Sequence, residues 1–203
     1  MKKVLFFTIA GLVALTSCNQ SKPLKTIENL KAGIKGEITA SEKYAAFAKV
    51  AVDEGNGAVA KLFEAASKAE AIHAANHEKV LESLGEEMED FKPEFVVKST
   101  EENLQAAIDG ETYESTSMYP QFLADAKAEK VEKAVKSFGW AFDTEKKHMQ
   151  FYDNALKALT SKTVNTLPQD YAVCPVCGNT YDKANMDANC AFCQTSKDKY
   201  IIF

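Results

Sequence analysis

Two Glu-x-x-His pairs, Glu70 with His73 and Glu145 with His148, have the residue types and spacing of metal ligands. A spacing of three places both side chains of a pair on one face of a helix. Each pair also interrupts a stripe of apolar residues that an amphipathic helix would turn towards a core. A single such pair usually lies on a protein surface, but two pairs within core stripes would bury charge at a cost of several kcal/mol. We therefore expect the four side chains to bind metal.

An internal repeat supplies further carboxylates in matching positions. Residues 29–37 read NLKAGIKGE and residues 103–111 read NLQAAIDGE, with six of the nine positions identical. The repeats end at Glu37 and Glu111, and Glu114 follows one helical turn later. The two helices that carry the Glu-x-x-His pairs align in the same way. The chain thus contains two copies of one helical hairpin, and a centre on the axis between them would receive matching ligands from both.

Five carboxylates and two imidazoles in one interior predict a dinuclear metal site. Two divalent cations would offset most of the negative charge, for which the core stripes offer few lysine or arginine candidates. One glutamate from each of two helices, with Glu-x-x-His from each of the other two, is the ligand pattern of di-iron and di-manganese bundles. Oxygen-rich ligand sets with histidine favour iron or manganese over metals that prefer thiolates.

The elements that must position these residues are four long helices, predicted over residues 26–53, 58–84, 99–126 and 129–159. Ser99 opens a capping box at the start of the third helix, which Pro120 is expected to kink. Gly85 is a suitable C-terminal cap for the second. The connection over residues 86–98, with strand-like residues 95–97, is long for a bundle. We therefore expect it to cross the structure and join two parallel neighbours.

Four cysteines towards the C-terminal end form two C-x-x-C pairs separated by twelve residues, Cys174 with Cys177 and Cys190 with Cys193. This spacing is typical of a tetrahedral site for one metal ion. An exported protein can instead oxidise such cysteines to disulfides. Four thiolates accept either iron, as a one-electron carrier, or structural zinc.

The N-terminus predicts export. Two lysines precede an apolar run over residues 4–15, which is short for a membrane span and ends in Leu-Thr-Ser-Cys18. This string resembles a bacterial lipoprotein signal, whose cysteine is acylated. We expect residues 1–17 to be a signal peptide, Cys18 to carry the lipid and residues 18–25 to be a tether. The protein would face the periplasm or the cell surface, anchored only by this lipid. A plain secretory signal and an uncleaved membrane anchor are the alternatives.

Residues 26 to 203 resemble rubrerythrin. The resemblance rests on the Glu-x-x-His pairs, the repeat glutamates, the additional Glu114, and the C-P-V-C-G and C-A-F-C motifs. It implies an all-α protein: a ferritin-like four-helix bundle with a long crossover over residues 26–160, a linker over 161–172, and a small rubredoxin-like domain over 173–203. The second cysteine motif departs from the family pattern because it lacks the usual proline and glycine. Zinc in the tail therefore stays open as an alternative to iron.

The resemblance also assigns the site. The implied iron ligands, which form the catalytic centre in the family, are Glu37, Glu70, His73, Glu111, Glu114, Glu145 and His148. Glu114 matches a seventh ligand that marks the family, and one iron is understood to exchange it for His73 when the redox state changes. Tyr44 and Tyr119 match tyrosines that hydrogen-bond within the site, although core packing explains both equally well. The expected cofactors are two oxo- and carboxylate-bridged irons and one iron held by the cysteines.

The implied activity is the reduction of hydrogen peroxide to water, with electrons passed from the cysteine-bound iron. In the family the tail often reaches the di-iron site of a partner subunit, so we expect a homodimer or a larger homo-oligomer. The family's electron donors begin with nicotinamide cofactors, but this chain has no G-x-G-x-x-G motif and needs an external donor. Its net charge of −5 argues against nucleic acid as a partner. The alternatives are an iron-binding or ferroxidase protein with structural zinc in the tail, and a peroxide sensor.

Overall fold

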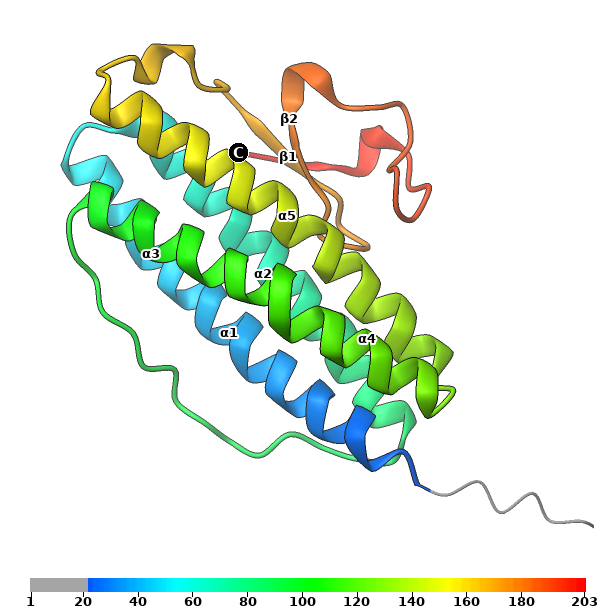
Figure 1. The fold of residues 1–203 in the computed structure, drawn as a ribbon. Coiled ribbons are helices and arrows are strands. Elements are labelled where there is room, and N and C mark those ends of the chain that lie inside the picture. Colours follow the sequence, from blue (N-terminus) through cyan, green and yellow to red (C-terminus); the bar gives the residue numbers. More distant parts are fainter. Residues whose placement is uncertain (1–21) are drawn as a thin grey trace, which may run out of the picture.

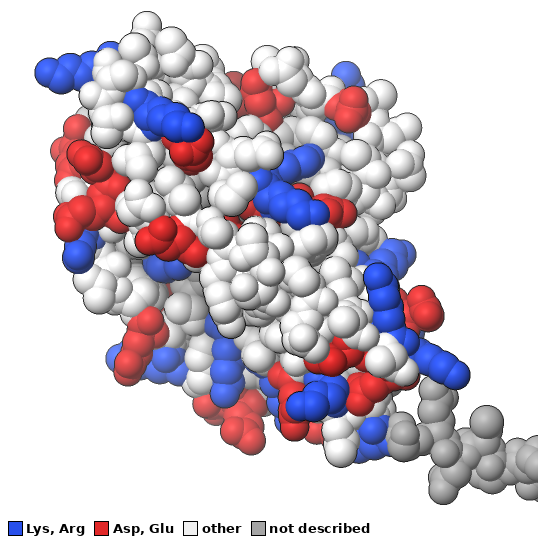
Figure 2. Space-filling model, in the orientation of Figure 1, with Lys and Arg blue, Asp and Glu red and all other residues white. Residues whose placement is uncertain are grey.

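The computed structural model describes residues 22–203, so the predicted signal peptide, Cys18 and the first part of the predicted tether lie outside the described residues. Four helical rods form a bundle, and a small three-stranded domain lies along one side of it (Figure 1). The predicted fold class is therefore confirmed. Figure 2 shows acidic and basic side chains interspersed over one face of the molecule. Over residues 22–203, no helix has the length and apolar character needed to cross a membrane.

Two helical hairpins build the bundle. The first consists of α1 (Leu24–Asp53) and α2 (Gly57–Ser83), and the second pairs a broken third rod with α5 (Glu132–Thr160). Gly55 lies in the turn after α1 and Gly85 follows α2, with φ angles of +78° and +77°. Glycine reaches this left-handed region without strain, which is why a glycine follows shortly after the last residue of each helix.

The third rod has three parts: α3 (Thr100–Tyr113), a π-helical turn (Glu114–Met118) and α4 (Tyr119–Ala128). The rod is thus interrupted next to Pro120, where a kink was predicted, although the π-helical turn itself was not predicted. A proline inside a continuous α-helix removes a backbone hydrogen bond and clashes with the preceding turn. Here Pro120 lies in the first turn of α4, and the wider π-helical turn before it absorbs the irregularity.

The connection between α2 and α3 runs along the outside of the bundle from one end to the other, so these two helices point the same way (Figure 1). This is the predicted crossover. The predicted strand character of residues 95–97 is wrong, because the segment has no strand partner within the described chain and Val96 is 70% exposed. Ser99 caps α3 as predicted, with its Oγ accepting the Glu102 N–H at 3.3 Å.

The apolar core is divided in two by a layer of ionisable residues. One cluster, which includes Phe47 and Phe63, fills the end of the bundle near the α1–α2 turn. The other, which includes Ile34 and Phe138, fills the opposite end. Along α1 the chain passes from one cluster to the other at Glu37, and α2 and α5 do the same at their Glu-x-x-His pairs. The ligand layer is thus held in place by apolar packing on both sides.

The C-terminal domain is an antiparallel sheet in the order β2-β1-β3, formed by β1 (Tyr171–Val173), β2 (Thr180–Asp182) and β3 (Ile201–Ile202). β1 begins inside the segment 161–172 that the sequence predicts as a linker. Tyr171 and Val173 are buried in the core cluster that includes Phe47. The sheet therefore packs directly on the bundle.

Candidate metal centres

Six of the seven predicted bundle ligands meet in two overlapping groups, within each of which the ligand atoms lie within 4.8 Å of one another. The first group is Glu37, Glu70, His73 and Glu145, and the second is Glu70, Glu111, Glu145 and His148. Glu70 and Glu145 belong to both groups, so these two carboxylates are placed to bridge two ions. Each hairpin contributes one terminal glutamate, one bridging glutamate and one histidine, as the internal repeat predicts.

The two histidines approach the bridging carboxylates from opposite sides. Nδ1 of His73 lies 2.9 Å from Glu70 Oε2 and 3.0 Å from Glu145 Oε1. Nδ1 of His148 lies 3.0 Å from Glu70 Oε1 and 3.1 Å from Glu145 Oε2. Each bridging carboxylate therefore turns one oxygen towards each histidine, which is the arrangement of a carboxylate that binds two ions at once.

The ligand set fits two metal ions because its atoms are buried and lack other partners. The six side chains are at most 2% exposed. Both oxygens of Glu70 and Glu145, Oε2 of Glu37, and Nδ1 of both histidines have no hydrogen-bond partner among residues 22–203. An unsatisfied buried polar group costs about 1–3 kcal/mol. Metal coordination would satisfy all of these atoms together.

The charges of the ligand set shift its pKa values in opposite directions. Burial and the neighbouring Glu145 raise the pKa of Glu37 to about 8. Burial also opposes ionisation of Glu70, but His148 and His73 outweigh it and lower the pKa of Glu70 to about 2. Burial disfavours the charged form of His148, but Glu70 and Glu145 outweigh it and raise the pKa of His148 to about 9. Cations bound at this site replace the protons held there, so metal binding releases protons.

Two buried tyrosines hydrogen-bond to the terminal glutamates. Tyr44 OH donates to Glu111 Oε1 at 2.6 Å, and Tyr119 OH donates to Glu37 Oε1. Both tyrosines also belong to the core clusters, so hydrogen bonding and core packing operate together. His77 lies behind Tyr119 with its Nε2 3.0 Å from the hydroxyl oxygen, outside the ligand set. Burial, with some help from His73, lowers the pKa of His77 to about 3, so it supports Tyr119 as a neutral imidazole.

Glu114, the seventh predicted ligand, belongs to neither group. It lies in the π-helical turn with its side chain half-buried. Burial and the negative charges of Glu37, Glu145 and Glu70 raise its pKa well above the usual range for a carboxyl group. The negative charge of the centre therefore acts on Glu114 although Glu114 is in neither ligand group. The fourth member of the first group is His73.

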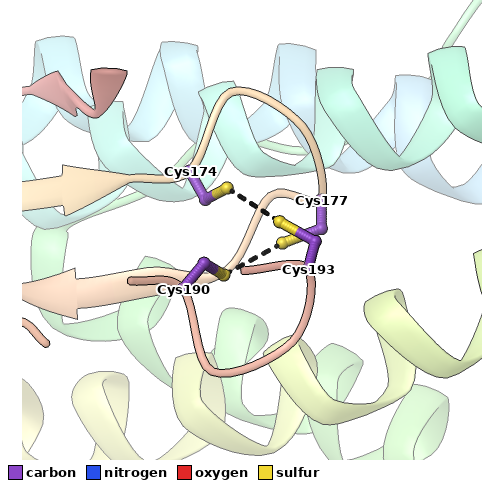
Figure 3. A group of neighbouring side chains, drawn as sticks. All are labelled: Cys174, Cys177, Cys190 and Cys193. Atoms are coloured by element: carbon purple, nitrogen blue, oxygen red, sulfur yellow. Dashed lines mark hydrogen bonds between the residues drawn. The ribbon is translucent and has the colours of Figure 1, made fainter. Parts of the chain in front are cut away.

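The four predicted cysteine ligands converge in the tail domain (Figure 3). Sγ of Cys174 lies 3.4 Å from Sγ of Cys193, and Sγ of Cys177 lies 3.4 Å from Sγ of Cys190. All four thiols are free, so the disulfide alternative is not what the structure contains. A tetrahedral ion about 2.3 Å from each sulfur needs sulfurs roughly 3.8 Å apart. The set is therefore close to the geometry of a metal site.

The second cysteine motif keeps the backbone of a metal-binding knuckle although it lacks glycine. Gly178 N donates to Cys174 O at 3.0 Å, and Gln194 N donates to Cys190 O at 2.9 Å. Gly178 has a φ of +80° and Gln194 a φ of +62°, so both occupy the left-handed region. The departure from the family pattern at Gln194 therefore leaves the sulfur geometry intact.

The tail domain covers the histidine side of the dinuclear centre within the same chain. Thr180 Oγ1 lies 2.8 Å from His148 Nε2, which directs Nδ1 of that ring to the metal site. Gly178 lies against the other ring, since a Cβ added there would be 2.3 Å from His73 Nε2. Gly178 and Thr180 are the first and third residues after Cys177, so one short segment joins a cysteine ligand to both histidines. The sequence pattern indicated neither contact.

Comparison with known proteins agrees with this geometry. Residues 28–156 match the rubrerythrin family. This chain belongs to the rubrerythrin family. It is 34% identical to nigerythrin from Nitratidesulfovibrio vulgaris over 183 residues, which covers 88% of this chain and 86% of that protein. It is 32% identical to rubrerythrin-2 from Clostridium acetobutylicum over 184 residues, which covers 90% of this chain and 98% of that protein.

Solved structures extend the likeness to the fold. Nigerythrin in its fully reduced, all-ferrous state superimposes with a TM-score of 0.78 at 32% identity, over 95% of this chain and 92% of that one. Bacterioferritin from Desulfovibrio desulfuricans, at 20% identity and a TM-score of 0.64, shares the bundle fold. Rubrerythrins bind a di-iron centre and a cysteine-ligated iron, and the two ligand clusters described above correspond to them. The chain is a di-iron oxidoreductase of the rubrerythrin type.

Replacing either bridging glutamate, as Glu70→Ala or Glu145→Ala, should remove both ions of the dinuclear centre, because each carboxylate belongs to both ligand groups. Glu37→Ala should weaken the binding of one ion more than that of the other, because Glu37 belongs to only one of the two ligand groups. Metal content per chain, measured by mass spectrometry, tests this, with circular dichroism to show that the helices remain. Glu64→Ala removes an exposed carboxylate of α2 and is the matched control. Full metal content in either bridging variant would rule out the bridging assignment.

Gly178→Ala should destabilise the metal-loaded protein more than Gly85→Ala. Both glycines have nearly the same φ, +80° and +77°, so the left-handed strain of about 1–2 kcal/mol is matched. A Cβ at 178 would also meet His73 Nε2 at 2.3 Å and Ala69 O at 3.1 Å, whereas nothing lies within 4 Å at 85. We expect an additional loss of about 1–3 kcal/mol in denaturant unfolding. Equal losses would mean that the tail is not seated on His73 in solution.

Proposed function

We propose that this protein reduces hydrogen peroxide to water at the di-iron centre and that the cysteine-bound iron of the tail returns the electrons. One peroxide, two electrons and two protons yield two water molecules. When bound, the di-iron centre supplies the two electrons that split the O–O bond. The observation that supports this function is that the chain segment following the ligand Cys177 contacts both histidines of the dinuclear site.

The protein's own residues hold the ligands and provide protons. Tyr44 and Tyr119 donate hydrogen bonds to Glu111 and Glu37, so the terminal carboxylates keep a fixed orientation. Glu114 is half-buried and its pKa is raised well above the usual range by burial and by the acidic centre. Burial and the acidic neighbours therefore favour the protonated form of Glu114 at the edge of the centre. A carboxylic acid in this position can deliver protons to reacting oxygen and recover them from solvent.

Electrons have a short protein route between the two sites. Thr180 and Gly178, which contact His148 and His73, follow the ligand Cys177 in sequence. An iron held by the four cysteines would be separated from the dinuclear ligands by this chain segment and the hydrogen bond between Thr180 and His148. An external donor would supply electrons to the tail.

We also propose a homodimer, in line with the family. The resemblance to rubrerythrin implied that the tail often reaches a partner's centre, and here it lies on the bundle of its own chain. Exchange of tails between two subunits would form the same contacts between chains. Either arrangement supports the same route for electrons.

Cys190→Ser should stop repeated turnover while still permitting one oxidation of the di-iron centre. The reason is that the centre holds its own two electrons, whereas the return of electrons needs the tail iron. The reduced protein is mixed with peroxide, and peroxide loss is followed together with the visible bands of ferric thiolate. In the wild type, oxidation of the tail iron should keep step with peroxide loss.

Two outcomes would overturn the role of the tail. One is zinc in the four-cysteine site of the native protein. The other is repeated turnover of Cys190→Ser at the wild-type rate with the same reductant. Either result would favour an iron-binding or ferroxidase protein with a structural tail metal, which shares the same dinuclear ligands.

We further propose that the protein is exported and anchored to a membrane by a lipid on Cys18. The apolar run and the Leu-Thr-Ser-Cys18 string support this location. Cys18→Ser should abolish labelling by radioactive palmitate and move the protein from the membrane fraction to the soluble fraction. Ser17→Ala, which keeps a small residue before the cysteine, should retain both properties. A wild-type protein found only in the cytoplasm would exclude the anchor.

A further inference from the structure

Lys147 is a half-buried lysine that connects the bundle to the tail domain and has no part in the steps above. It follows Glu145 by two positions on α5 and immediately precedes His148. Its Nζ lies 2.6 Å from Asn179 Oδ1, and 4.4 Å and 4.9 Å from the ring centroids of Tyr181 and Phe192. Successive helical residues point about 100° apart. Neighbouring residues of one helix therefore serve the dinuclear centre and the cysteine site.

The side chain of Asn179 lies between Lys147 and a cysteine ligand and contacts both. Asn179 is fully buried. Its Nδ2 donates to Tyr181 OH at 2.7 Å and lies 3.6 Å from Cys190 Sγ. Because Lys147 binds Oδ1, the amide is kept from turning its oxygen towards the sulfur. The N–H of Asn179 is therefore directed at a thiolate.

Both groups favour negative charge at the cysteine site. Reduction of an iron held by four thiolates adds one negative charge to a buried cluster. A nearby ammonium group and an N–H directed at sulfur stabilise that charge, and hydrogen bonds to sulfur are known determinants of such potentials. The aromatic rings of Tyr181 and Phe192 hold the ammonium group by cation–π contacts. Phe192 lies between the two cysteines of the second motif, so this contact links Lys147 directly to that motif.

We propose that Lys147 is a positioning residue for the tail iron: it fastens the tail to the bundle and holds the Asn179 N–H on Cys190, which favours the reduced state. The tail iron then accepts electrons more readily when it is docked on the dinuclear centre than when it is detached. This inference rests on the proposed function, because that function assigns iron to the four-cysteine site.

The test compares Lys147→Met with Lys146→Met in the full, metal-loaded protein. Both variants lose one positive charge from adjacent positions, but Lys146 is 45% exposed and pairs with Asp143 at 3.1 Å. Redox titration of the ferric thiolate bands should show that Lys147→Met lowers the equilibrium constant for reduction about tenfold, equal to about 59 mV. Lys146→Met should match the wild type, and Lys147→Arg should recover most of the effect. Equal potentials in all four proteins would overturn the proposal.

A second readout does not depend on the native tail metal. The tail is loaded with cadmium, and the ¹¹³Cd chemical shift, which responds to hydrogen bonds at sulfur, is measured in the same variants. The ¹¹³Cd shift should differ from that of the wild type in Lys147→Met and in Asn179→Ala but not in Lys146→Met. The double variant that combines Lys147→Met with Asn179→Ala should change the shift by less than the sum of the two single changes. Additive shifts, or an unmoved shift in Lys147→Met, would refute the contact. Absence of ferric thiolate bands in the native protein would count against the proposed function, and the cadmium result would then decide the inference alone.

Discussion

Negative charge enclosed in the middle of the bundle is the constraint on which the rest of the structure depends. Four glutamates there are at most 2% exposed. Well-packed apolar side chains in the same layer would give a bundle of equal or greater stability without any metal. The two flanking apolar clusters hold the helices together, so the ligand layer is free to serve coordination. Along each helix, the residues that stabilise the bundle are thus different from the residues that would bind metal.

The sequence predicted the bundle and its six grouped ligands because helical periodicity converts linear spacing into a shared face. Glu70 and His73 show this directly, and the repeat that relates Glu37 to Glu111 predicted the symmetry. The crossover could also be predicted, since a connection of that length has to join distant helix ends. These features depend on local pattern and length, which one sequence contains.

Other features depended on tertiary neighbours and could not be predicted. The π-helical turn that precedes Pro120 depends on what the surrounding helices accommodate. Residues 95–97 have the propensity of a strand, but no strand lies beside them within the described chain. The contacts of Thr180 and Lys147 join two domains, and neither leaves a periodic signal. Irregular helical turns occur often at functional sites, and the one described above carries Glu114.

The seating of the tail over both histidines has a consequence for how the protein acquires and keeps its ions. All bundle ligands precede Cys174 in the chain, so the dinuclear ligand set does not include any residue of the tail. A bundle on which the tail is not yet seated can therefore take up its ions from the histidine side. Once Gly178 and Thr180 settle on the two rings, escape of an ion past the histidines requires the tail to lift first. Retention of iron on this side then depends on the rate at which the tail lifts as well as on the affinity of the ligands.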